Sequence, residues 1–300
     1  MKIGIDIGGS HIAVGVITYN GTIICKSEKD LPSSLKTDEY GEFIIKTIIE
    51  LIEDVLEKAQ KDITKISLIG IAVPGMVSET SIIKAENLHI KNLEITKEIN
   101  KYFNVPVKLK NDAKCAALAE KEYGSLKKAK DAVFLSLGTG IGGAVFLNDE
   151  LLVPKKYEGF EIGHMVIQKN GIKCNCGRSG CFEKYASMRA LKEKLAEKLK
   201  LENITGEELK KILEDTKNEE VNNIIDEYID NLCIGIANLT NIFEPEIISI
   251  GGSFAFYEKV LLKKLEERLK KEKLFNKENM PKLVVAKLKN DAGMIGAVLI

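Results

Sequence analysis

Residues 3–21, IGIDIGGSHIAVGVITYNG, and residues 132–149, AVFLSLGTGIGGAVFLND, share one pattern. In each stretch a short apolar strand leads through a glycine-rich turn into a second apolar strand, which ends at a polar turn. The first stretch ends in Asn20-Gly21, a dipeptide that favours a tight hairpin. Repetition of such a unit within one chain predicts a duplicated domain, and the intervening helical segments predict α/β layers.

The rest of the chain completes two lobes of mixed structure. In the first half, the patterns predict strands at Lys2–Ile7, Ile12–Thr18, Thr22–Ser27, Ile66–Val73 and Val105–Leu109, and helices at Glu39–Gln60, Leu93–Phe103 and Asp112–Tyr123. In the second half they predict strands at Ala132–Leu137, Ala144–Leu147, Ile247–Ile250 and Leu283–Ala286, and helices at Glu183–Leu199, Thr216–Phe243, Ala255–Lys271 and Asp291–Leu299. We therefore expect an N-terminal lobe at 1–117, on which the C-terminal helix 291–300 packs, and a second lobe at 118–290.

The composition limits the kinds of partner. Of the 300 residues, 45% are hydrophobic, which is enough for a substantial core. The 44 Lys and Arg residues balance the 44 Asp and Glu residues, so bulk charge predicts neither a nucleic acid nor an anionic membrane as partner. The chain begins without a signal-peptide pattern and has no apolar run long enough to span a bilayer. These features predict a cytoplasmic protein.

The two glycine turns are candidate phosphate sites. Backbone N–H groups of such turns form concavities that fit anions. Residues 138–143 formally match a dinucleotide-binding loop, but a strand follows instead of a helix, which excludes a Rossmann site. One glycine turn alone would more often be a simple hairpin. Two equivalent turns, each with a hydroxyl, favour phosphate binding through Gly8, Gly9 and Ser10 and through Gly138, Thr139 and Gly140.

Two further features fit a nucleotide site. Asp6 interrupts an apolar strand just before the first turn, and a carboxylate buried there is costly without a cation such as the Mg²⁺ that accompanies ATP. Gly251-Gly252 follows a predicted strand, where an ordinary turn is the simpler interpretation. In a two-lobed nucleotide-binding protein, this glycine pair could let the backbone pass close to the adenosine.

A cysteine cluster predicts a metal site. His164, Cys174, Cys176 and Cys181 lie within 18 residues and form a Cys₃His set typical of a closed, structural zinc site in the loop 164–181. The alternative, three free thiols on one loop, would be prone to oxidation. The other cysteines, Cys25, Cys115 and Cys233, are isolated in apolar segments and are predicted to be small buried residues.

Polar residues beside the cluster suggest what it supports. Glu161 and Glu183 flank the zinc loop, and zinc on one nitrogen of His164 would leave the other nitrogen for a ligand. Two carboxylates and an imidazole can engage several hydroxyls, which suits a sugar. The alternative is that both glutamates are ordinary surface residues.

Asn111-Asp112 lies between a predicted strand and a predicted helix. Either residue could simply be a helix N-cap. The carboxyl end of a strand in an α/β sheet is also where ligands bind, so a carboxylate there could take a proton from a sugar hydroxyl during phosphoryl transfer.

Taken together, these motifs resemble the ROK family of sugar kinases and repressors, within the actin-like, hexokinase-like ATPase superfamily. The resemblance rests on residues 4–10, 73–75, 111–113, 138–143, 161–164 and 174–183, with a further fit at 291–297. It implies a duplicated actin-like (ribonuclease H-like) ATPase fold with a cleft between two lobes, and a homodimer. It also implies ATP-dependent phosphorylation of a hexose at its 6-hydroxyl, with glucose the leading candidate and N-acetylmannosamine or another hexosamine the alternative.

The resemblance also implies roles for individual residues. By position, Asp112 is the base, and the sugar ligands are Gly75, Asn87, Asn111, Asp112, Glu161, His164 and Glu183. Asp6 and the two turns hold magnesium and phosphates. The chain departs from the family pattern at Ser10-His11, where many relatives have Thr-Lys, and at 87–92, which lacks a common tryptophan.

Two other functions compete with a kinase. Repressor relatives carry a DNA-binding domain before the first turn, whereas the matching stretch here begins at residue 4. A catalytically silent sugar-binding scaffold would be expected to lack Asp6 or Asp112, and both are present. The sequence therefore favours a kinase that binds a small sugar and ATP.

Overall fold

The computed structural model describes residues 1–32, 39–153, 161–215, 217–272 and 280–300, except for the side chain of Asn87. Contacts divide the chain into two compact units. The first unit includes Met1–Lys127 and Asn290–Ile300, and the second includes Lys128–Leu152 and the chain up to Lys289. The boundary expected at residue 117 falls inside α3 (Asp112–Tyr123), which lies wholly in the first unit.

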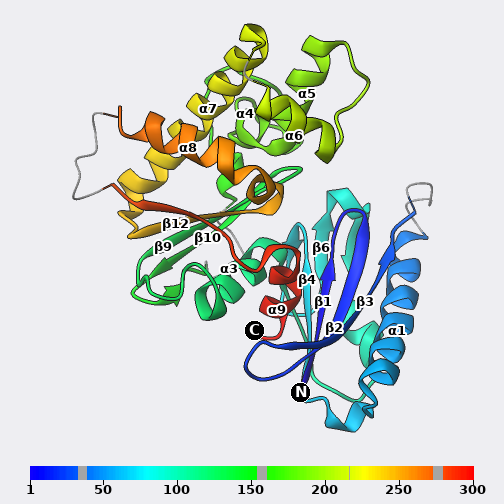
Figure 1. Ribbon diagram of the computed structural model, residues 1–300. Helices are drawn as coiled ribbons and strands as arrows, with labels where there is room; N and C mark the ends of the chain where they lie inside the picture. Colours follow the sequence, from blue (N-terminus) through cyan, green and yellow to red (C-terminus); the bar gives the residue numbers. More distant parts are fainter. Residues whose placement is uncertain (33–38, 154–160, 216, 273–279) are drawn as a thin grey trace. The chain divides into compact units, whose positions relative to one another are not determined.

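The first unit is built on a five-stranded sheet in the order β3-β2-β1-β4-β8 (Figure 1). Its strands are β1 (Lys2–Ile7), β2 (His11–Ile17), β3 (Ile23–Asp30), β4 (Ile69–Val73) and β8 (Val107–Asn111). The first three form an antiparallel meander, and β1, β4 and β8 run parallel. Asp6 pairs with Ala72, and Val73 pairs with Asn111, so the carboxyl ends of the parallel strands meet at one edge.

The second unit repeats this arrangement in the sheet β11-β10-β9-β12-β13. Its strands are β9 (Ala132–Leu137), β10 (Ile141–Leu147), β11 (Glu150–Leu151), β12 (Ile247–Gly251) and β13 (Lys282–Val285). As in the first sheet, the meander is antiparallel and the last strands are parallel to its first strand, β9. Both glycine turns therefore occupy the same position, between the first two strands of a sheet.

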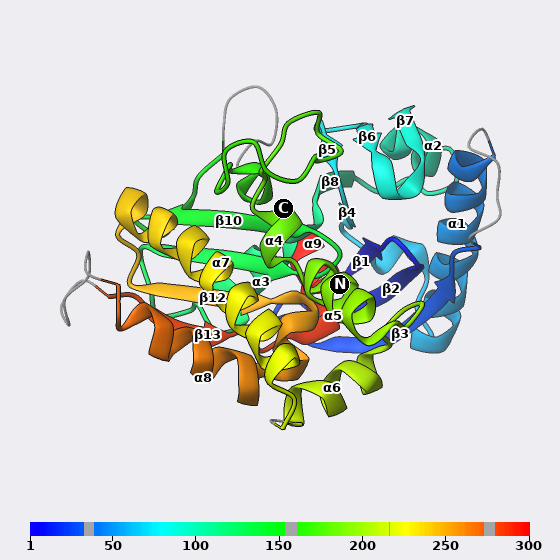
Figure 2. The same ribbon diagram turned by 90° about the horizontal axis from the view of Figure 1, so that it is seen from above.

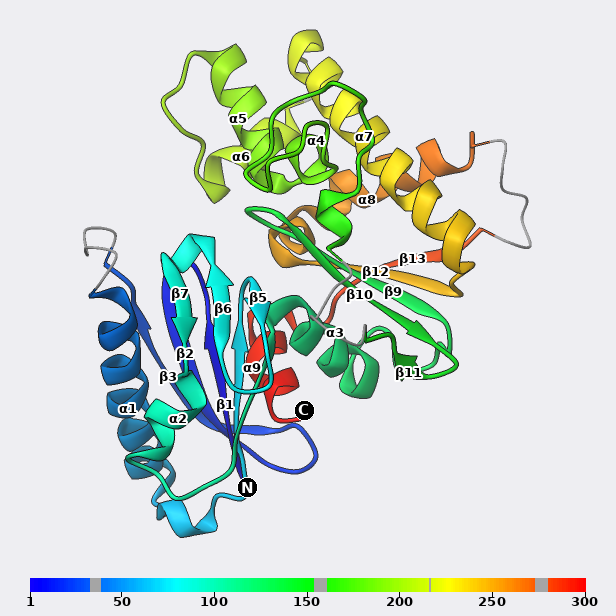
Figure 3. The same cartoon turned by 180° about the vertical axis from the view of Figure 1, so that it is seen from behind.

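Helices cover the first sheet. α1 (Tyr40–Ala59) turns a stripe of buried side chains, including Ile44, Ile48 and Val55, toward β2 and β3. This spacing of three to four residues places them on one face of the helix. α9 (Ala292–Ala297) packs against α3 and β1, as Figures 1 and 3 show. The C-terminal segment thereby completes the first unit, and α2 (Ile95–Asn100) contacts β8.

The second unit is richer in helix. Its helices are α4 (Glu183–Ala186), α5 (Met188–Leu199), α6 (Gly206–Glu214), α7 (Glu219–Phe243) and α8 (Glu258–Leu269), with short 3-10 segments η3 (Ile162–His164) and η4 (Gly252–Tyr257). α7 and α8 lie side by side (Figure 2), and α7 buries Leu232, Ile236 and Leu239 in the core. Within the described residues, no helix is both long and apolar enough to cross a bilayer.

Several predicted boundaries were wrong. β10 begins at Ile141, because residues 141–143 pair with β9, so the second glycine turn is only 138–140. The helix predicted at 183–199 is interrupted at Ser187, whose hydroxyl accepts a hydrogen bond from the Ala190 N–H and caps α5. The helix predicted from residue 255 starts at Glu258. The helix predicted from Thr216, which lies outside the described residues, starts at Glu219.

Some elements of the described chain were not predicted. One is a small sheet of β5 (Met76–Val77), β6 (Ile82–Ala85) and β7 (Ile90–Leu93), whose strands are too short to show a clear alternation (Figure 3). Another is α6, which begins with a reciprocal capping box between Thr205 and Glu208. Of the isolated cysteines, Cys115 and Cys233 are buried as predicted, but Cys25 is only partly buried because it lies on β3 at the edge of the sheet.

Candidate active site

Three carboxylates gather at the carboxyl edge of the first sheet. Asp6 lies near the end of β1, Asp112 is the first residue of α3, and Asp291 ends η5 (Lys289–Asp291) just before α9. Burial, together with the negative charges of Asp112 and Asp291, raises the pKa of Asp6 from 3.8 to about 7, with burial the largest cause. A cation beside Asp6 would therefore stabilise its ionised form.

The space for Asp6 depends on α9. A Cβ atom added to Gly293 would lie 2.3 Å from the Asp6 Oδ2 atom, so only glycine leaves room for this carboxylate. Asp291 is held by an ion pair with Lys26 on β3, with 2.9 Å between Nζ and Oδ1. Sequence reasoning did not include Asp291 and Gly293 in the site. Their signal was Asp291-Ala292-Gly293, which supported the family resemblance and predicted a final helix but was assigned no role in the site.

Asn111 bonds to Gly75 and also caps the helix that begins at Asp112. Its side-chain oxygen accepts hydrogen bonds from the backbone N–H groups of Ala113 and Lys114, so Asn111 is the N-cap of α3. Its amide nitrogen donates to the Gly75 carbonyl at 3.2 Å. The helix-cap interpretation is therefore correct for Asn111, while Asp112 begins the helix with its Oδ1 atom 2.8 Å from the Ala113 nitrogen.

Gly75 follows β4 in a conformation that favours glycine. Its φ is +95°, and an added Cβ atom would lie 2.3 Å from the Lys84 carbonyl oxygen. The backbone of the turn after β4 is therefore held against β6 on one side and Asn111 on the other. Asn87 lies in η2 (Glu86–Leu88), but its side chain is outside the described part of the structure.

The first glycine turn joins β1 and β2. Gly9 and Ser10 are exposed, and the Gly8 N–H donates to the His11 carbonyl at 2.9 Å. The Ser10 hydroxyl lies 3.3 Å from the His11 Nδ1 atom. The hydroxyl and the glycine backbone are thus presented at the same sheet edge as Asp6.

The four predicted zinc ligands converge in the second unit. Their ligand atoms all lie within 4.8 Å of one another. The Cys174 Sγ atom is 3.6 Å from His164 Nδ1, and the Cys176 and Cys181 sulfurs are 3.5 Å apart. Zinc–sulfur bonds of about 2.3 Å in a tetrahedron imply edges of about 3.7 Å. The donor set therefore fits a tetrahedral zinc ion.

The thiols of the cluster are not equivalent. Burial raises the pKa of the Cys174 thiol to about 12 and also raises the pKa of Cys181. A backbone hydrogen bond from Arg178 lowers the pKa of the exposed Cys176. Zinc binds the thiolate form, so a metal here must displace protons from the two buried sulfurs.

Glu183 reaches from the cluster to the second glycine turn. Its Oε1 atom lies 3.2 Å from Cys174 Sγ and 3.7 Å from His164 Nδ1. A Cβ atom added to Gly140 would lie 2.7 Å from the other oxygen, Oε2. The exposed Glu161 directly precedes η3 and accepts the His164 N–H through its backbone carbonyl at 2.9 Å. Glu183 thus lies next to His164 through its side chain, and Glu161 contacts it through its backbone carbonyl.

The predicted glycine pair Gly251-Gly252 lies at the end of β12, beside the end of β9. Gly252 has a φ of +68°, and an added Cβ atom would lie 2.5 Å from the Leu137 carbonyl oxygen at the end of β9. Within the second glycine turn, the Gly138 N–H donates to the Gly140 carbonyl at 3.0 Å, and Thr139 is exposed. Gly252 therefore lies against the residue that directly precedes the turn Gly138–Gly140.

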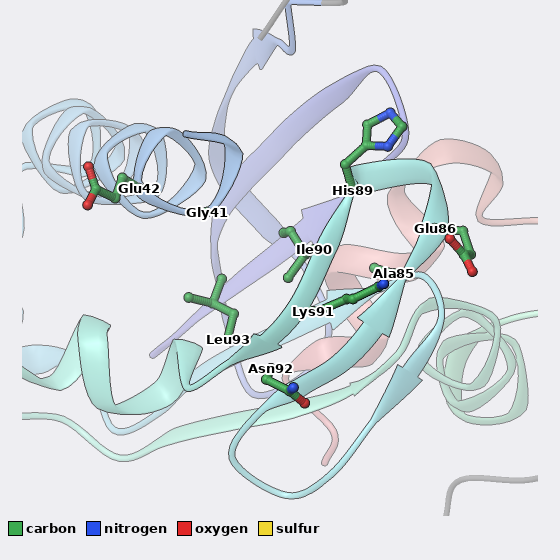
Figure 4. Close-up of a pocket in the computed structure, with 9 residues that line it drawn as sticks. All are labelled: Gly41, Glu42, Ala85, Glu86, His89, Ile90, Lys91, Asn92 and Leu93. Carbon is green, nitrogen blue, oxygen red and sulfur yellow. The ribbon is translucent and has the colours of Figure 1, made fainter. Parts of the chain in front are cut away.

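A separate hollow of about 660 Å³ lies between the start of α1 and the β6–β7 connection (Figure 4). It is lined by Gly41, Glu42, Ala85, Glu86, His89, Ile90, Lys91, Asn92 and Leu93. Gly75, Asn111 and Asp112 are absent from this described lining. The hollow is therefore separate from these candidate site residues.

The chain belongs to the ROK family, whose model matches residues 2–300. It is 32% identical to a glucokinase of Thermotoga maritima, with 99% of this chain and 96% of the glucokinase covered. It is 30% identical to a xylose repressor of Caldicellulosiruptor bescii, with 99% of this chain and 76% of the repressor covered.

Among solved structures, a putative N-acetylmannosamine kinase from Listeria monocytogenes has the same fold. Its TM-score is 0.82 and its sequence identity 27%, with 100% of this chain and 98% of that protein covered. The mixed α/β fold with two similar sheets is therefore that of ROK sugar kinases.

Proposed function

We propose that this protein is an ATP-dependent sugar kinase that phosphorylates the 6-hydroxyl of a hexose, with Asp112 as the general base. Glucose is the first candidate substrate, and N-acetylmannosamine or another hexosamine is the alternative. The observation that carries the proposal is the acidic edge of the first unit. There Asp112 begins α3 close enough to Asp6 to raise its pKa, next to the Asn111–Gly75 hydrogen bond.

The reaction assigns one task to each group. Asp112 accepts the proton of the sugar hydroxyl as its oxygen attacks the γ-phosphorus of ATP, and the bond to the β-phosphate oxygen breaks to release ADP. Asn111 and Gly75, with Glu161, His164 and Glu183, hold the sugar so that the attacking oxygen is oriented. The turns 8–10 and 138–140 bind phosphates through backbone N–H groups, and Gly251-Gly252 lies beside the adenosine.

Two metals fit the residues present. Asp6, whose ionised form is disfavoured by burial and by two neighbouring carboxylates, suits the Mg²⁺ that accompanies ATP. This ion supplies neutralisation of charge on the phosphates. The Cys₃His cluster suits a structural zinc ion, which would fix the loop carrying His164 and the chain entering α4.

The xylose repressor relative supports a second candidate, a sugar-responsive regulator without turnover. Two parallel measurements on one panel of sugars distinguish a kinase from a regulator. ATP consumption is followed with glucose, mannose, fructose, N-acetylglucosamine and N-acetylmannosamine, and binding of each sugar is measured in parallel. A kinase consumes ATP with at least one of them, and a regulator binds a sugar while ATP stays intact. We also expect a homodimer, to be checked by light scattering.

A further inference from the structure

Glu183 lies between the cysteine cluster and the second glycine turn, which are a candidate metal site and a candidate phosphate site. Its Oε1 atom lies against the cysteine cluster, and its Oε2 atom faces the α-carbon of Gly140 in the second glycine turn. A second contact joins the same segments, since the Arg189 N–H of α5 donates to the Gly138 carbonyl at 3.2 Å. The chain from Glu183 to Arg189 therefore touches the turn at both of its glycines.

The backbone at Glu183 has little freedom to adjust. Phe182 is fully buried, and its N–H donates to the Met165 carbonyl at 2.7 Å. Its ring lies directly on Gly235 of α7, where an added Cβ atom would come within 2.2 Å of the ring. Because the preceding residue is fixed in this way, the Glu183 carboxylate can respond to a neighbour only by rotating its own side chain.

We propose that Gly140 is a positioning residue for the sugar site, because its missing side chain sets where the Glu183 carboxylate lies. This inference rests on the proposed role of Glu183 as a sugar ligand. A methyl group on Gly140 would lie 2.7 Å from Oε2, which is the far end of a flexible side chain. The carboxylate can move away at small energetic cost, so the fold survives while the ligand leaves its position.

The same turn provides a matched control. A Cβ atom added to Gly138 would meet no described atom within 4 Å. Neither glycine has a positive φ, so alanine is compatible with the backbone at both positions. The two substitutions add the same methyl group to the same turn, but only one of them displaces Glu183.

The test is sugar binding by calorimetry without nucleotide, so that turnover and phosphate contacts play no part. Loss of a hydrogen bond to a charged group weakens binding by about tenfold or more. Gly140→Ala is expected to raise the sugar Kd by at least this factor, whereas Gly138→Ala stays within about twofold. Gly140→Ala with Glu183→Asp, which withdraws the carboxylate by one methylene, should lose no more affinity than Glu183→Asp alone.

Equal sugar affinities for Gly140→Ala and Gly138→Ala would overturn the inference. A second measurement does not depend on any sugar. Substitution of groups that contact metal ligands alters metal affinity by about tenfold or more. Because Glu183 contacts Cys174, its displacement in Gly140→Ala should change the rate of zinc release to a chelator. Gly138→Ala should leave this rate unchanged. If the unsubstituted protein bound none of the sugars, the proposed function would fail, and the zinc-release rates would still decide the positioning of Glu183.

Discussion

The side chain of Asn111 donates a hydrogen bond to the Gly75 carbonyl at 3.2 Å while its oxygen caps α3. One amide therefore joins the ends of β4 and β8 and fixes the start of the helix that carries Asp112. The helix-cap and ligand-site interpretations of this position, which compete in the sequence, are compatible in the structure.

Two substitutions at Asn111 separate these tasks. Asn111→Ala removes both the cap and the donor, and loss of a cap costs about 1 kcal/mol, so the melting temperature should fall by about 2 °C. Asn111→Asp retains the cap oxygens but loses the donor to Gly75. We expect it to keep most of the stability and to raise the sugar KM, as measured by thermal melting and steady-state kinetics. Equal melting temperatures for Asn111→Ala and the unsubstituted protein would contradict the capping role.

Asp6 should make stability fall as pH rises. Its pKa is about 7 in the folded state and 3.8 when unperturbed, so the unfolded chain releases this proton first. The folded state is therefore penalised progressively between about pH 4 and pH 7, and fully above pH 7. Asp6→Asn should raise the melting temperature at pH 8 and have little effect at pH 4, with Asp30→Asn on the exposed end of β3 as the control.

Stabilisation by Mg²⁺ tests whether Asp6 belongs to the metal site. If Asp6 faces the cation, millimolar Mg²⁺ with ADP should stabilise the unsubstituted protein at pH 8 more than it stabilises Asp6→Asn. An identical shift in melting temperature for both proteins would remove Asp6 from the metal site.

The cysteine cluster predicts about one zinc ion per chain in the purified protein. Cys176→Ser should lose most of this zinc, because the remaining donors cannot close a tetrahedron. Cys233→Ser, which changes a buried cysteine on α7, should retain it. Metal analysis by mass spectrometry tests both variants. Zinc retained in full by Cys176→Ser would contradict the ligand set.

The pKa values of the thiols also predict how zinc binding depends on pH. Because burial raises the pKa of Cys174 and Cys181, zinc must displace their protons, and its affinity should rise steeply with pH. Competition with a chromophoric chelator between pH 6 and pH 8.5 measures this slope. An affinity independent of pH would show that these sulfurs do not bind the metal as thiolates.

Local patterns predicted much of this site because its parts are local in sequence. The four candidate metal ligands lie in one 18-residue stretch, and each glycine turn directly joins two strands. Asp112–Tyr123 was predicted with its observed bounds, because Asn111 marks its start and Gly124 its end. For these features, the chemistry of neighbouring residues in the sequence is sufficient for the prediction.

Contacts between distant segments could not be predicted in the same way. Asp6 meets Asp112 and Asp291 only because β1, β4 and β8 are parallel neighbours and α9 returns to β1. The contact between Glu183 and Gly140 depends on where α4 lies relative to the turn 138–140, which no periodicity encodes. The extent of β10 was misjudged because glycines 142 and 143 resemble a turn, yet pair with β9.

The most direct test of the account is the turnover of Asp112→Asn with the best sugar of the panel. General-base catalysis contributes about 10²- to 10⁴-fold. We expect kcat to fall by at least the lower figure, with the melting temperature and the binding of ADP little changed. Turnover within a few-fold of the unsubstituted enzyme would contradict Asp112 as the base and, with it, the proposed mechanism.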